Sequence, residues 1–232
     1  FSNDIKNRFN VFSMSFNRKM MTRQIQLAAP MGLQEATIAF GWTWFMKIVG
    51  IIGIVELATT HIVFTIMHAS FMPAMGVGMA CSTLVSKYMG EKKVEKSVSS
   101  IKESVRLAEY GMGILGVSFI LFPRFYLSIF TGDASIVEMG VFGLRGAGAL
   151  QFLDAVGFVL MFALTGAGNT VFPAIVDSVS TWVVVVAGTY FFAVYLGFGF
   201  IVPWLLFPLH MFIFSGAMTW KIYKGDWKEI EV

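Results

Sequence analysis

Long stretches without a charged residue dominate this sequence. The longest covers residues 178–220, and its 43 residues exceed the roughly 20 that one membrane-spanning helix needs. Gly197, Gly199 and Pro203 supply a break inside it, so we expect two helices there. Charged residues make up 13% of the chain, against roughly 25% in soluble domains. Since a soluble fold of this size would have too much surface for so few charges, the sequence indicates an integral membrane protein.

The apolar blocks are long and continuous, which favours helices over the short alternating strands of a membrane barrel. At roughly 20 residues a span plus loops, the 232 residues suit about six spans. We therefore expect an all-α membrane protein built as a six-transmembrane-helix bundle. A cytoplasmic amphipathic segment would occupy residues 1–24, the six-helix lobe 25–222 and a cytoplasmic tail 223–232. The expected spans are about 27–49, 57–84, 104–128, 137–164, 171–196 and 201–221.

Lysine and arginine gather on one side of this six-span arrangement. The N-terminal segment, the region between spans two and three and the tail hold 14 of the 17 basic residues. The exceptions are Lys47, Arg124 and Arg145. Because basic loops stay in the cytoplasm, we expect a multi-pass protein of the cell (inner or plasma) membrane with both termini cytoplasmic. The net charge of +3 then reflects membrane topology, and no nucleic-acid partner is expected.

The N-terminal residues mix basic and apolar side chains. Residues 9–23 combine Phe, Val and Met with Arg and Lys, which predicts an amphipathic segment on the cytoplasmic membrane surface. A solvated linker is the alternative. The segment lacks the uninterrupted apolar core of a signal peptide. The first residue is Phe1, not Met, which favours a fragment or a processed piece.

Two acidic residues fall inside the expected spans. Glu35 lies about eight residues into the first span and Asp154 roughly midway along the fourth, so both should lie near the bilayer centre. Ionisable groups at that depth are costly and are functional candidates by default. Two carboxylates that face one cavity could share a proton or bind a small cation. The alternative is that each only forms a hydrogen bond to a neighbouring helix.

Polar residues near these carboxylates are secondary candidates for lining a cavity. Gln34 directly precedes Glu35, and Gln151 lies three residues before Asp154, so each could orient its carboxylate through a hydrogen bond. His68 lies deep in the second span and could line a cavity or titrate, although a histidine there is more often a packing residue.

Motifs for several other chemistries are missing from the sequence. There is no Gly-rich phosphate loop ending in Lys and Ser or Thr, no His-Glu-x-x-His and no Gly-x-Ser-x-Gly. Cys81 is the only cysteine, so a cysteine metal cluster and a disulfide framework are excluded. We therefore expect no enzyme activity, no cofactor and no certain metal site.

Several segments, taken in order, resemble the multidrug and toxin extrusion (MATE) transporters. They look like that family's seventh helix, its eighth helix with the exit loop, its tenth helix with the following turn, and its C-terminal tail. Each motif is short, and their order and spacing make the resemblance fairly specific. The residues are Leu27–Gln34, Ala58–Ile62, Phe71–Gly78, Ser82–Val85, Gly90, Asp154–Val156, Leu164–Thr170, Trp227, Lys228 and Ile230.

The resemblance implies a twelve-helix fold of two six-helix lobes, with this chain as the C-terminal lobe. It implies a secondary antiporter that exports drugs or other amphipathic organic compounds, driven by inward movement of H⁺ or Na⁺. Asp154 matches an acidic residue of the family's tenth helix that serves cation coupling or substrate binding, and would hold any Na⁺. A tyrosine one turn earlier in some members is Leu150 here, which weakens a Na⁺ assignment. The position of the seventh-helix glutamate of many members falls on Ile38 here, so either Glu35, one turn earlier, replaces it or the coupling site has shifted.

The resemblance implies three kinds of partner for this chain: a second six-helix lobe, membrane lipids and an amphipathic organic substrate. The N-terminal six-helix lobe could belong to the same full-length chain, to a split partner or to a second copy of this chain. Two other functions stay open. One is a flippase for lipid-linked oligosaccharides, or a polysaccharide exporter, of the same superfamily, which the mainly acidic mid-span charges disfavour. The other is a non-transporting membrane scaffold subunit.

Overall fold

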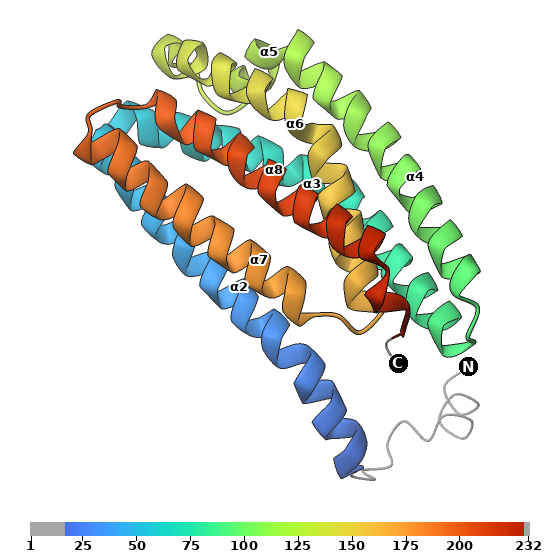
Figure 1. Cartoon of the computed structure of the whole chain (residues 1–232). Coiled ribbons are helices and arrows are strands. Elements are labelled where there is room, and N and C mark those ends of the chain that lie inside the picture. The colour runs from blue at the N-terminus through green and yellow to red at the C-terminus, as the bar shows by residue number, and fades with distance from the viewer. Residues whose placement is uncertain (1–16, 230–232) are drawn as a thin grey trace, which may run out of the picture.

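The computed structural model describes residues 17–229, which form a bundle of long helices (Figure 1). Within these residues, six helices are long and apolar enough to cross a membrane, and no residue adopts a strand. The expected all-α bundle of six helices is therefore confirmed. The helices are α2 (Arg18–Ile52), α3 (Ile54–Gly90), α4 (Val94–Leu121), α6 (Ala134–Gly166), the composite span Val171–Tyr195 and α8 (Ile201–Lys224).

Helix α6 lies at the centre of the bundle. It packs against α3, α4 and α8, whereas α2 packs mainly against α3 and the fifth span. The most apolar stretch of α6 is 61% buried inside the lobe, compared with 22% for α2. In Figure 1, α2 runs beside α7 at one edge of the bundle, and α4 forms the opposite edge. The buried face of α6 can therefore enclose a polar side chain such as that of Asp154, whereas most of α2 lies on the surface of the lobe.

Glycines set the distance between α4 and α6. A Cβ on Gly116 would collide with the carbonyl oxygen of Gly148, and a Cβ on Gly148 would collide with the carbonyl oxygen of Gly116. Small residues allow membrane helices to approach closely, and here both positions need the absence of a side chain. The side chain of Gln151 also lies against Gly116. This contact holds the segment of α6 that carries Gln151 and Asp154 tightly against α4.

The first span begins earlier than expected. Of the expected segment 1–24, residues 1–16 lie outside the described residues, and residues 18–24 form the first turns of α2. Asn17 caps this helix, because its side-chain oxygen accepts a hydrogen bond of 3.2 Å from the backbone N–H of Met20. No helix boundary lies at residue 24.

The expected third span, 104–128, is two helices. Helix α4 ends at Leu121, and the short helix α5 (Pro123–Ser128) follows after Phe122. Pro123 occupies the first position of α5, where its missing backbone N–H costs no helical hydrogen bond, and proline disfavours the continuation of α4 through this point. The break turns the chain before α6 begins.

The fifth span is not a uniform α-helix. Helix α7 (Val171–Ser180) continues in the wider π-helical geometry of η1 (Thr181–Ala187) and η2 (Tyr190–Tyr195). Gly197 and Gly199 then adopt positive φ angles of 74° and 69° in the turn before α8. Glycine reaches this left-handed region without strain, which explains the break inside the long charge-free stretch. A short 3₁₀ turn, η3 (Asp226–Glu229), follows α8.

Candidate functional site

Asp154 is a carboxylate enclosed by the bundle. Its residue is 1% exposed, and neither carboxylate oxygen has a hydrogen-bond partner among the described residues. The following positions on α6, Ala155 and Val159, belong to an apolar cluster shared by α3, α4, α6 and α8. A buried polar group without a partner is costly, and a buried charge more so. A proton or a small cation at Asp154 would lower this cost, because it neutralises the buried charge.

Gln151 lies next to Asp154 on α6 but binds another helix. Its Nε2 donates a hydrogen bond of 2.9 Å to the Ser70 hydroxyl on α3, and that hydroxyl donates one of 2.6 Å to the carbonyl oxygen of Met67. The side-chain oxygen of Gln151 is buried without a partner among the described residues. The expected hydrogen bond to Asp154 is therefore absent, because the Gln151 amide points toward α3.

Glu35 and Asp154 do not form the expected shared cavity within this chain. Glu35 is exposed on α2, and the carboxyl on which its charge acts is that of Asp177. Neither oxygen of Asp154 has a hydrogen-bond partner in the described part of the chain, and Glu35 is not near enough to share its environment. The physical reason is position in the bundle: α2 lies at the edge beside α7, whereas Asp154 lies inside on α6.

The other expected cavity residues are scattered. Gln34 is buried, but it donates a hydrogen bond of 2.9 Å to Asp177 and not to Glu35. Ile38 is half-buried on α2, and His68 is exposed on α3. Leu150 is buried in an apolar cluster with Trp204 and other side chains of α3, α6 and α8. Of the six residues named beside Asp154, only Gln151 and Leu150 lie within the same stretch of α6.

A second polar cluster lies where α2, α7 and α8 meet. Asp177 on α7 accepts the Gln34 hydrogen bond through Oδ2, and its Oδ1 lies 3.8 Å from Nε2 of His210 on α8. The His210 side chain is 7% exposed and that of Asp177 17%. The Nδ1 atom of His210 is buried without a partner among the described residues.

Reasoning from sequence missed this second cluster. Neither Asp177 nor His210 was among the expected site residues. A signal was present, since His210 is the one titratable histidine inside the 43-residue charge-free stretch that Asp177 precedes. Their meeting could not be foreseen, because they lie 33 positions apart on separate helices.

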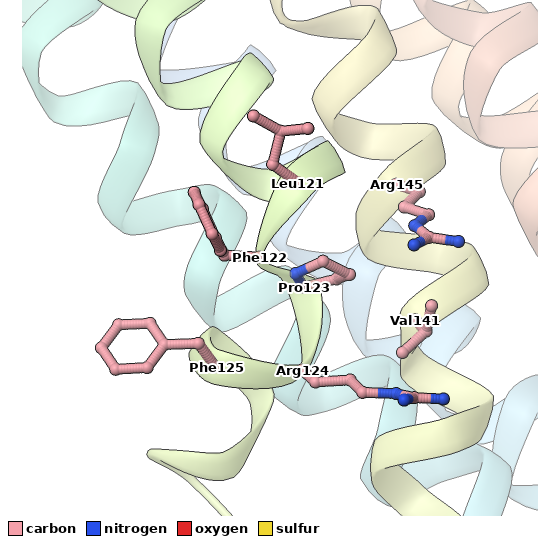
Figure 2. Close-up of a pocket in the computed structure, with 7 residues that line it drawn as sticks. All are labelled: Leu121, Phe122, Pro123, Arg124, Phe125, Val141 and Arg145. Atoms are coloured by element: carbon pink, nitrogen blue, oxygen red, sulfur yellow. The ribbon is translucent and has the colours of Figure 1, made fainter.

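A surface pocket of about 370 Å³ lies at the break between α4 and α5. Figure 2 shows Arg124 reaching from α5 toward α6, with Arg145 above it on α6. Arg124 forms an ion pair of 2.9 Å with Glu138, and Arg145 donates a hydrogen bond of 3.3 Å to the carbonyl oxygen of Ile120. Asp154 does not line this pocket, so the cationic pocket and the buried carboxylate are separate features.

Metal ligation by side chains finds no support in the described residues. They contain no group of three or more His, Cys, Asp or Glu side chains placed to hold a metal ion. Asp154 offers two free oxygens but no second carboxylate beside it. Any Na⁺ there would need hydroxyl, amide or carbonyl oxygens for its remaining ligands.

Comparison with known proteins gives a consistent family pattern. A family model described as MatE matches residues 30–191. The "Probable multidrug resistance protein NorM" of Thermotoga maritima is 28% identical over 205 residues, which are 88% of this chain and 44% of that protein. The protein of the same description from Rhizobium meliloti is 23% identical over 185 residues, 76% of this chain and 39% of that one. The chain thus spans about half the length of these curated relatives.

Solved structures show the same fold. A structure described as "Crystal structure of MATE in the bent conformation" superposes with a TM-score of 0.82 at 17% identity, over 91% of this chain and 47% of that one. The eukaryotic MATE transporter AtDTX14 gives a TM-score of 0.81 at 14% identity, over 95% and 49% of the two chains. At such low identity the likeness concerns the fold alone, which is that of one lobe of these proteins.

Proposed function

The chain belongs to the MatE family, and on that premise we propose that it is one six-helix lobe of a cation-coupled antiporter that exports amphipathic organic compounds. The description of its relatives as multidrug resistance proteins supports this substrate class. Because the chain spans about half of those relatives, the working transporter needs a second lobe. Alternating access then comes from movement of the two bundles around a site between them.

One observation carries this proposal: the carboxylate of Asp154 on α6 is buried inside the bundle without a hydrogen-bond partner among the described residues. A charged carboxylate there is costly, so binding of H⁺ or Na⁺ stabilises the closed packing around it. When the surroundings open and the cation leaves, the exposed charge is hydrated or attracts a cationic substrate group. Exchange of a cation for a substrate at one carboxylate is the elementary step of antiport.

The distribution of Lys and Arg supports an orientation in the membrane. In the described part of the chain, every Lys and Arg except Lys47, Arg124 and Arg145 belongs to the end of the bundle that carries both described termini, so we place that end on the cytoplasmic side of a cell membrane. Export then means release at the α5 end. The exposed apolar side chains of the six helices face membrane lipids or the partner lobe.

Cation-gradient-driven uptake into proteoliposomes tests the proposal. This chain is reconstituted together with its partner lobe under an imposed H⁺ or Na⁺ gradient, and uptake of a fluorescent lipophilic cation is measured. We expect Asp154→Asn to lower cation-driven transport by about tenfold or more. The matched control is Glu138→Gln, which changes an exposed acid on the same helix and should leave transport within about twofold.

Two outcomes count against the proposal. Undiminished transport in a folded Asp154→Asn protein would remove Asp154 from the coupling mechanism. Absence of gradient-driven transport in the parent protein, with flipping of a lipid-linked oligosaccharide instead, would replace the antiporter by the flippase.

A further inference from the structure

The cluster at the junction of α2, α7 and α8 is a built polar site that the proposed coupling role of Asp154 does not use. Gln34, Asp177 and His210 come from three different helices; Gln34 and His210 are buried, and the Asp177 between them is largely buried. His210 lies between two aromatic rings, those of Phe207 and Phe214, whose centroids are each 6.3 Å from the imidazole. The imidazole and the carboxylate therefore face each other in a largely apolar environment.

The charges around the pair leave it without a permanent counter-ion. From α2 the facing groups are Gln34, which is neutral, and Glu35, which is acidic. From α8 it is His210, and within the described residues Asp177 forms an ion pair with no other side chain. Without a proton, the pair carries one negative charge, and Glu35 adds to it. With one proton, the pair is neutral or forms an internal ion pair, either of which suits an apolar environment better.

The helices that carry the pair are irregular at this level. The π-helical segment η1 begins at Thr181, one turn after Asp177, and Pro208 lies inside α8 two residues before His210. π-Helical turns often mark functional sites, and a proline interrupts the hydrogen bonds of its helix. The backbone at both partners can thus change geometry at a lower cost than in a regular helix.

We propose that Asp177 and His210 share one exchangeable proton and form a second proton-binding site, distinct from Asp154. The proton adds to the free imidazole nitrogen or to the carboxylate, and it leaves to water when the junction of α2, α7 and α8 opens. Gln34 holds the Asp177 carboxyl in place through its amide. The part of this site in transport rests on the proposed function, whereas proton binding itself can be measured without transport.

Nuclear magnetic resonance of the histidine ring nitrogens tests the site directly. The chain, together with its partner lobe, is labelled with ¹⁵N-histidine, placed in liposomes and titrated between about pH 5 and pH 8. His210→Gln identifies the His210 signals by their loss. We expect the His210 signals to change with pH in the parent protein. In Asp177→Asn, that change should disappear or shift by about tenfold or more in proton concentration.

The controls separate proton sharing from a merely structural contact. His68→Gln removes an exposed histidine on α3 and should leave the His210 titration unchanged. Gln34→Leu removes only the hydrogen bond to Asp177 and should shift the titration in the same experiment, which keeps the test decisive if Asp177→Asn does not fold. A His210 titration that is absent in the parent, or identical in the parent and in every folded variant of Asp177 and Gln34, would overturn the site.

The outcome is independent of the coupling role assigned to Asp154. If Asp154→Asn transports normally while His210 still titrates with Asp177, the proposed function fails and the second site stands. If Asp154→Asn abolishes transport while His210 is insensitive to Asp177, the second site fails alone.

Discussion

The amide of Gln151 on α6 donates a hydrogen bond of 2.9 Å to the Ser70 hydroxyl on α3, and both side chains are buried. This contact joins two central helices one turn from the unpartnered carboxylate of Asp154. A hydrogen bond between neutral groups matters most when its loss leaves a buried partner unsatisfied. The Ser70 hydroxyl therefore holds the Gln151 side chain of α6 in place by accepting its hydrogen bond.

Ser70→Ala should destabilise the lobe by about 1–3 kcal/mol, because the buried Gln151 amide loses its acceptor. Chemical unfolding in detergent micelles measures the effect. Thr65→Ala is the control, since Thr65 is exposed on the same helix and donates only to the carbonyl oxygen of His61. Equal stability of Ser70→Ala and the parent would show that Gln151 finds another partner.

Gly116→Ala should also lower the stability of the lobe, by about 1–3 kcal/mol. The new Cβ meets the carbonyl oxygen of Gly148 and forces α4 and α6 apart. Thermal unfolding is a suitable measurement. On the same helix, Gly111→Ala is the matched control, since nothing lies within 4 Å of its Cβ position. That control should be neutral or slightly stabilising, because alanine favours a helix over glycine. A harmless Gly116→Ala would contradict the close approach of the two backbones.

Trp182→Phe should loosen the contact between η1 and α2. The indole Nε1 of Trp182 donates a hydrogen bond of 3.0 Å to the carbonyl oxygen of Thr37, and phenylalanine cannot replace that donor. We expect a loss of about 0.5–1.5 kcal/mol and faster amide exchange in α2 near Thr37. Trp44→Phe changes an exposed tryptophan on the same helix as Thr37 and should have a smaller effect on both readouts.

Asp226 should make the docking of the C-terminal turn sensitive to acid. The hydrogen bond of 2.7 Å from Lys221 holds the pKa of Asp226 below its usual 3.8. A lowered pKa means that the contribution to stability is present at neutral pH and is lost as the pH falls through the folded-state pKa. The indole of the neighbouring Trp227 is buried and donates to the carbonyl oxygen of Ile222, so it reports on this docking.

Fluorine resonance of 5-fluorotryptophan at position 227 measures that effect. The signal should move toward an exposed environment below pH 3.8 in the parent, and Asp226→Asn should show the change already at neutral pH. Glu91→Gln is the control, because it removes the Lys93–Glu91 ion pair in the turn between α3 and α4. A Trp227 signal that ignores both acid and Asp226→Asn would show that apolar packing alone holds the turn.

The sequence by itself determined the membrane-spanning helices and the burial of one carboxylate. Long charge-free stretches are a local property, and each span must satisfy its own backbone in lipid, so helices follow without knowledge of the neighbours. Asp154 is flanked by apolar residues on both sides, so its place roughly midway along a long apolar helix could also be read from the sequence. The MATE resemblance, also read from sequence, named the fold of the lobe. The ends of α2 and α4 were less predictable, because a single cap at Asn17 and a single proline at Pro123 decide them.

Only the tertiary structure decided which polar groups meet. Glu35 and Asp154 were expected together, yet helix packing places Glu35 near Asp177 and leaves Asp154 without a hydrogen-bond partner among the described residues. Gln34 and Gln151 were expected to bind the carboxylates of Glu35 and Asp154. Instead, Gln34 binds Asp177 on α7 and Gln151 binds Ser70 on α3. The physical reason is that rotation and neighbours of a helix depend on the packing of its whole surface, including glycine contacts such as Gly116 with Gly148. The position of a residue along its helix can be read from the sequence, whereas the packing of the helices against one another determines which side chains a buried residue contacts.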